Sequence, residues 1–160
     1  MKIFIKHLIV SCLLVAALSG CKKTSSPNPV PVVVPDTTKP TITITKPTVG
    51  QAFAPGSTIP FQATFSDNEK LGTYDIAISK VVTGGLILKV VPTSLAYSYT
   101  KSSTSFNTGV KQQEIILSDI TPIPANTATN IVTPGKYNLK VTCVDGSNNS
   151  TSTTIEININ

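Results

Sequence analysis

Apolar side chains recur at every second position over most of the chain from Thr41 onward, without the three- or four-residue spacing of a helix. Successive side chains of a strand point to opposite faces, so this period predicts strands that each bury one face. Seven or eight such strands in about 120 residues predict an all-β fold, an antiparallel two-sheet sandwich. We expect strands over residues 41–45, 58–66, 73–80, 86–91, 95–99, 111–118, 135–145 and 151–159, a turn at 83–85, and loops at 101–109 and 119–134.

The first twenty residues have the pattern of an export signal. Lys2 and Lys6 supply a positive start, and residues 8–18 (LIVSCLLVAAL) form an apolar stretch. Eleven helical residues rise about 16 Å, whereas the hydrocarbon core of a bilayer is about 30 Å thick. The stretch is therefore too short for a transmembrane anchor, and we interpret residues 1–20 as a signal peptide that is removed.

The residues at the expected cleavage site, 18–21 (LSGC), resemble the lipobox of bacterial lipoproteins. The resemblance implies that the thiol of Cys21 receives a diacylglycerol and that cleavage makes Cys21 the first residue of the mature chain. Two or three acyl chains, at about 0.8 kcal/mol for each buried CH₂, hold a protein on a membrane. The alternative is a chance cysteine beside an ordinary cleavage site. In bacterial lipoproteins an aspartate directly after the cysteine favours retention in the inner membrane. Here lysines follow at 22 and 23, so the resemblance implies the outer membrane. It does not distinguish the periplasmic side of that membrane from the cell surface.

Residues 22–40 (KKTSSPNPVPVVVPDTTKP) contain five prolines. Pro-rich segments favour the extended polyproline II helix, at about 3.1 Å per residue. We therefore divide the chain into a lipoprotein signal peptide (1–20), a lipidated cysteine with a Pro-rich tether (21–40) and one β-sandwich domain (41–160).

The charged residues argue against a nucleic-acid partner. All 13 basic residues are lysine, and several of them lie in the signal and the tether rather than in the expected domain. Arginine, which makes bidentate contacts with phosphate and guanine, is missing, and the domain has no lysine cluster.

Residue types used in catalysis are scarce. The single histidine is His7, within the signal peptide, so no histidine base remains after cleavage. Cys12 leaves with the signal and Cys21 carries lipid, which leaves Cys143 as the one free thiol. Cys143 continues an alternating apolar run, which predicts a buried and inert thiol. We therefore expect that the protein is not an enzyme.

Three segments carry a family resemblance: the strand start at 36–44 (DTTKPTITI), the loop at 65–71 (FSDNEKL) and the ending at 135–149 (GKYNLKVTCVDGSNN). They resemble bacterial immunoglobulin-like domains and, more narrowly, an uncharacterised family of short Gram-negative lipoproteins with one such domain. The resemblance implies an immunoglobulin-like sandwich in which Tyr137 forms a tyrosine corner. The chain lacks the core tryptophan and the paired cysteines of antibody-type domains.

Oxygen-bearing side chains gather at one end of such a sandwich. Asp67, Asn68 and Glu69 follow a strand, and in an immunoglobulin-like fold this turn lies at the same end as the turn after Asp145. Asp36 enters from the tether at that end. Calcium binds six to eight oxygens, often from several loops, so these five residues are predicted calcium ligands. The alternative is that they are ordinary turn formers.

Two tyrosines suggest a ligand surface. Tyr97 and Tyr99 share one face of the strand expected at 95–99, and paired rings of this kind stack on sugars. Leu95 has the same parity, so this face could equally belong to the core.

The tether carries one further motif. Asp36-Thr37-Thr38 resembles the sequon at which some Gram-negative bacteria O-glycosylate exported proteins, which makes Thr37 a predicted glycosylation site. The alternative is that these residues start the turn into the first strand.

Two functions follow from these observations. The first is a membrane-anchored cell-envelope lipoprotein that presents a non-catalytic immunoglobulin-like module for structural or protein-interaction roles. The alternative is a lipoprotein that captures a glycan or small ligand for an uptake system. A flat exposed sheet edge would favour the protein partner, and a tyrosine-lined groove would favour the sugar.

Overall fold

The computed structural model describes residues 34–82, 93–120 and 122–160. One compact unit extends from Pro35 to Asn160, so the last residues of the expected tether belong to the folded unit. The signal peptide, Cys21, the strand expected at 86–91 and the turn at 83–85 lie outside the described residues. In the part of the chain that is described, no helix is long and apolar enough to cross a membrane.

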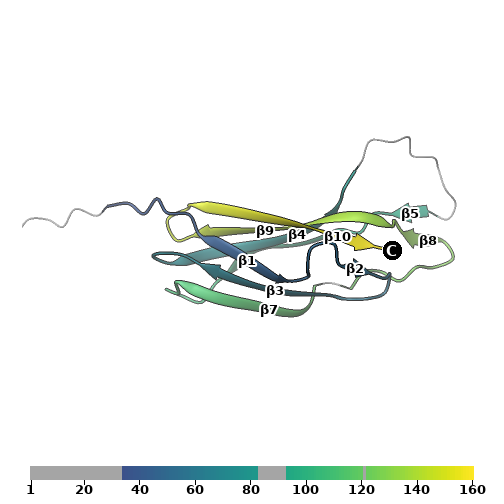
Figure 1. Ribbon diagram of the computed structural model, residues 1–160, viewed down its shortest axis with the longest axis horizontal. Helices are drawn as coiled ribbons and strands as arrows, with labels where there is room; N and C mark the ends of the chain where they lie inside the picture. The colour runs from purple at the N-terminus through teal and green to yellow at the C-terminus, as the bar shows by residue number, and fades with distance from the viewer. Residues whose placement is uncertain (1–33, 83–92, 121) are drawn as a thin grey trace, which may run out of the picture. The chain divides into compact units, whose positions relative to one another are not determined.

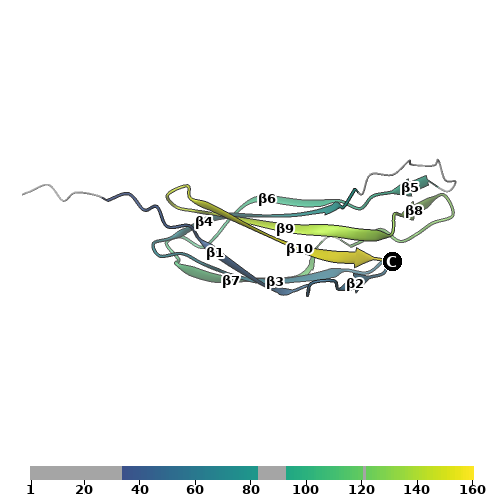
Figure 2. The same ribbon diagram turned by 45° about the horizontal axis from the view of Figure 1, so that its top comes forward.

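The compact unit is a two-layer β-sandwich, which confirms the predicted fold class (Figures 1 and 2). One sheet has the strand order β1-β3-β7, the other β2-β10-β9-β4-β6, and β5 pairs with β8 in a small third sheet. The pairs β10–β2 and β5–β8 are parallel, and the remaining pairs are antiparallel. The strands are β1 Thr41–Lys46, β2 Ala52–Phe53, β3 Ile59–Ser66, β4 Leu71–Lys80, β5 Thr93–Leu95, β6 Tyr99–Ser105, β7 Gln112–Ile120, β8 Asn130–Val132, β9 Gly135–Asp145 and β10 Ser150–Ile159.

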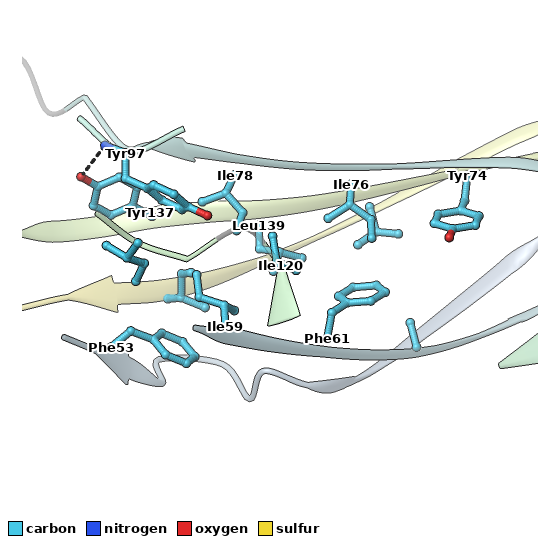
Figure 3. Close-up of a cluster of buried hydrophobic side chains, with 14 of the residues drawn as sticks. Phe53, Ile59, Phe61, Tyr74, Ile76, Ile78, Tyr97, Ile120, Tyr137 and Leu139 are labelled. Carbon is cyan, nitrogen blue, oxygen red and sulfur yellow. Dashed lines mark hydrogen bonds between the residues drawn. The ribbon is translucent and has the colours of Figure 1, made fainter. Parts of the chain in front are cut away.

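The core lies between the two large sheets and follows the predicted alternation (Figure 3). Every second residue of β3 is buried, and so is every second residue of β9 from Tyr137 to Asp145. Phe65 of β3 packs on Tyr74 of β4, with ring centroids 5.5 Å apart, and on Phe106, at 5.0 Å. Offset and edge-on ring contacts of this kind add to the stabilisation that comes from burying apolar area.

Tyr137 forms the predicted tyrosine corner. Its hydroxyl donates a hydrogen bond to the carbonyl oxygen of Thr133, at 2.6 Å. It accepts one from the backbone amide of Tyr97, at 3.3 Å (Figure 3). The buried hydroxyl therefore has both a donor and an acceptor partner, as a polar group in a core requires.

The loop predicted at 101–109 is wrong, because residues 99–105 form strand β6. This strand pairs with β4 at the edge of its sheet, and its side chains are exposed or half-buried. An edge strand of this kind buries no apolar stripe, so its sequence (YTKSSTS) lacks the alternation that marked the other strands. The described residues form ten strands rather than seven or eight, because β2, β5 and β8 are only two or three residues long.

Candidate functional site

Three aspartates from distant parts of the sequence meet at one end of the sandwich. Asp36 lies ahead of β1, Asp67 directly follows β3, and Asp145 is the last residue of β9. Each offers a carboxylate oxygen, and these oxygens all lie within 4.8 Å of one another. Figure 1 shows the segment ahead of β1 and the turn between β9 and β10 at the same end of the sheets. We call this group the acidic cluster.

Asp67 is held by the turn that follows it. Its Oδ2 accepts hydrogen bonds from the backbone amides of Glu69, at 2.9 Å, and Lys70, at 2.8 Å. The residue is only 9% exposed, and its Oδ1 is buried without a hydrogen-bond partner among the described residues. The turn therefore fixes one carboxylate oxygen and leaves the other unpaired.

Asp145 is held by the turn between β9 and β10. Its Oδ1 accepts from the amides of Ser147 and Asn149, both at 2.8 Å, and its Oδ2 accepts from the Asn149 side chain at 2.7 Å. Asp145 is 3% exposed, so this carboxylate is the most buried of the three.

Asp36 is attached to both turns by asparagine side chains. Its Oδ1 accepts from the Thr38 amide, at 2.9 Å, and from Asn68 Nδ2, at 3.1 Å, while its carbonyl oxygen accepts from Asn149 Nδ2, at 3.1 Å. The bonds from Thr38 and Asn68 lower the pKa of the Asp36 carboxyl, since both favour its charged form. Its Oδ2 is buried and has no hydrogen-bond partner in the described part of the chain.

The five predicted ligands divide into two groups. Asp36, Asp67 and Asp145 come together, as expected from their positions at one end of an immunoglobulin-like sandwich. Asn68 instead donates its amide to Asp36, and Glu69 contributes its backbone amide to Asp67. A sixth residue, Asn149, was not among the predicted ligands; its side chain bonds to both Asp36 and Asp145. Its place four residues after Asp145, in a turn rich in Gly, Ser and Asn, was the available signal.

The predicted tyrosine platform does not form. Tyr97 precedes β6, is 5% exposed and packs against Tyr137 with ring centroids 6.4 Å apart. Burial raises the pKa of Tyr97 to about 12. Tyr99 begins β6 and is half-buried. Because Tyr97 is core, the two rings do not offer an exposed stacking face. Leu95, which shares their parity, is 53% exposed, so the expected 95–99 strand does not form a core face either.

A pocket lies beside the small β5–β8 sheet. Its volume is about 340 Å³, and its lining is mainly apolar. The lining includes Leu95, Tyr97, Pro122, Pro124 and Val132.

Two further residues singled out in the sequence, Cys143 and Thr37, lie within the described residues. The Cys143 thiol is buried, and desolvation, together with the nearby charges of Asp67 and Asp145, raises its pKa to about 12. A thiol with this pKa is protonated at neutral pH and is a poor nucleophile. Thr37 is exposed, beside the turn that the Asp36 side chain makes with the Thr38 amide, and its glycosylation stays a prediction.

Comparisons with known proteins give a family and a distant structural likeness. The family described as "Domain of unknown function (DUF4625)" matches residues 20–160 of the chain. No curated protein matches. Among solved structures, the chain is similar to a chain from the structures of Clostridium thermocellum CbhA fibronectin(III)-like modules, with 16% sequence identity and a TM-score of 0.39. The similarity covers 75% of this chain and 46% of that one, so this chain spans less than half the length of that protein chain.

Proposed function

Since the chain belongs to the family described as a domain of unknown function (DUF4625), whose description names no activity, we propose a role from its own residues. We propose that it is a lipid-anchored protein of the cell envelope that presents a non-catalytic immunoglobulin-like module for structural or protein-interaction roles. The observation that carries this proposal is the lipobox-like segment ending at Cys21, followed by a Pro-rich tether and one compact unit from Pro35.

The anchor is supported by the sequence on both sides of Cys21. A short apolar stretch and two small residues precede it, and no acidic residue follows it before Asp36. Lipid on Cys21 would keep the module on a membrane, and the lysines that follow Cys21 favour the outer membrane. Residues 22–34 would then separate the acyl chains from the compact unit.

A protein partner is supported by the edge of the three-stranded sheet. β7 pairs with β3, and none of the described strands pairs with its other side. Ile116 of β7 is 64% exposed, between Ile115 and Leu117, which are partly buried against the core. An exposed strand edge with apolar side chains is a template on which another chain can add a strand.

The pocket beside β5 and β8 supports the alternative, capture of a small ligand for an uptake system. Its lining favours a small apolar ligand over a sugar, because the Tyr97 ring is part of the core and not an exposed stacking surface. The exposed β7 edge makes a protein partner the first proposal.

Replacing Cys21 with serine tests the anchor. We expect the Cys21→Ser protein to take up no labelled palmitate and to leave the membrane fraction, since serine has no thiol to receive the diacylglycerol. The wild-type chain in the same cells should be labelled and should partition into detergent. Labelling that persists in the Cys21→Ser protein would contradict the proposal.

A photo-crosslinking amino acid at residue 116 tests the protein partner. Incorporated in place of Ile116 in cells that make the wild-type anchor, it should give a discrete, heavier crosslinked species. The matched control is the same amino acid at Lys140, an exposed position of β9 that is paired with β10 on one side and with β4 on the other. Equal crosslinking from both positions, or none from residue 116, would count against the β7 edge as a binding surface.

A further inference from the structure

We propose that the acidic cluster is a calcium site in which Asp36, Asp67 and Asp145 join the segment ahead of β1 to the turns that follow β3 and β9. This goes beyond the anchored module proposed above and does not depend on it. Two observations carry it: Asp36, Asp67 and Asp145 each bring a carboxylate oxygen within 4.8 Å of the others, and Asp36 and Asp67 each have one buried oxygen without a hydrogen-bond partner among the described residues.

Asp36 and Asp67 each have a carboxylate oxygen that could bind a cation. In both Asp67 and Asp36 one carboxylate oxygen is fixed by amide donors, while the other is buried without a partner among the described residues. A buried acceptor that lacks a partner carries its full desolvation penalty, and the penalty is larger for a charged group. The amide donors thus hold each carboxylate so that one oxygen stays available to a cation.

The negative charge of the acidic cluster also favours a bound cation. Three carboxylates so close together repel one another, and the repulsion is strongest between Asp67 and Asp145, which are both buried. The one ion pair formed within the described residues is Lys136–Glu156, away from this cluster. The ammonium of Lys111 comes to the same end, but it donates to the Asn68 carbonyl oxygen, at 2.7 Å. A bound cation would supply the positive charge that these carboxylates lack.

The ligand atoms indicate calcium. All three are carboxylate oxygens, the hard ligands that calcium and magnesium prefer, and zinc prefers histidine and cysteine. Magnesium keeps several waters and is usually held by one or two carboxylates, whereas calcium takes six to eight oxygens, often from several loops. Three carboxylates from three separate segments, with oxygens within 4.8 Å of one another, therefore suit calcium better.

The site would also fasten the start of the folded unit. Asp36 belongs to no strand, and it is attached to the two turns by asparagine side chains. Without a cation, repulsion from Asp67 and Asp145 works against these bonds. With calcium bound, residues 36–39, at the end of the expected tether, should be held more firmly.

The test uses a soluble form of residues 22–160, which contains the whole compact unit with its own core. After removal of metal with a chelator, calcium titration at about 0.15 M ionic strength should show one ion per chain, with Kd in the range of about 10⁻⁴–10⁻³ M typical of extracellular modules. At ten times Kd, the melting temperature should rise by about 3–8 °C. Exchange of the Thr38 amide should slow in the same samples.

Two isosteric variants locate the ion. Asp36→Asn and Asp67→Asn keep an oxygen that can accept the amide hydrogen bonds but remove one charge, so each should weaken calcium binding at least tenfold. In chelator, Asp67→Asn should melt at a higher temperature than the wild type, because like-charge repulsion is relieved. A purely structural role for the Asp67 carboxylate predicts a lower melting temperature instead. Asp75 lies on β4 and its carboxylate accepts a hydrogen bond from the Ser103 amide of β6, so Asp75→Asn should leave the calcium response unchanged.

Several results would overturn the site. Melting curves that coincide in chelator and in about 10 mM calcium would show that no ion binds. A calcium response that both variants retain would place the ion elsewhere. Equal affinity for magnesium would refute the choice of calcium.

Discussion

Replacing Phe65 with alanine is expected to lower the free energy of unfolding by about 3–5 kcal/mol. The ring is fully buried, and it packs on Tyr74 and Phe106 between the two large sheets. Alanine removes most of this apolar area and leaves a cavity that the paired strands β1, β3 and β7 can only partly close. Urea unfolding of the soluble 22–160 form, followed by circular dichroism, measures the loss.

Ile116→Ala is the matched control for Phe65→Ala. Ile116 lies on β7 of the same sheet but is 64% exposed, so its truncation should change the free energy of unfolding by no more than about 0.5 kcal/mol. Similar losses in the two variants would contradict the assignment of Phe65 to the core.

Replacing Gly72 with alanine should cost about 1–3 kcal/mol, although it adds only one methyl group. That methyl would lie 2.6 Å from the carbonyl oxygen of Asp145 and 2.8 Å from that of Val144. Both are backbone atoms of β9, a strand paired on both sides, so β4 and β9 must separate locally. Their register shifts between Leu71 and Thr73, where the two backbones approach closely. Thermal unfolding of the same soluble form measures the loss.

Gly146→Ala separates backbone clashes from side-chain clashes. The atoms nearest to its added methyl belong to the side chain of Lys70, which is flexible and can move away, rather than to a backbone. We expect it to cost clearly less than Gly72→Ala. If the two variants were equally stable, close backbone approach at Gly72 would not be the cause.

The long strands and their buried faces could be predicted because alternation is a local property of the chain. The run through Tyr137, Leu139, Val141 and Cys143 was expected to face the core, and all four side chains are fully buried. The tyrosine corner was expected only from the family resemblance, and the structure adds its partner, the Thr133 carbonyl oxygen four residues earlier.

The candidate site was only partly accessible to the same reasoning. In an immunoglobulin-like fold the turns after Asp67 and Asp145 lie at the same end of the sandwich, so these two residues and Asp36 were expected together there. It could not show which oxygens the turns occupy and which they leave unpaired. That depends on Asn68 and Asn149, whose amides reach Asp36 across 32 and 113 residues of sequence.

Alternation in the sequence by itself determined that the chain forms strands and which side of each long strand is buried. The tertiary structure alone decided that residues 99–105 form a strand, because β6 takes its shape from pairing with β4 and not from an apolar stripe of its own. It also decided that Tyr97 belongs to the core, where its amide bonds to the Tyr137 hydroxyl 40 residues away. The alternation of apolar residues is a local property that shows which side of a strand each side chain takes. Strand pairing and polar contacts depend instead on segments that meet only after folding.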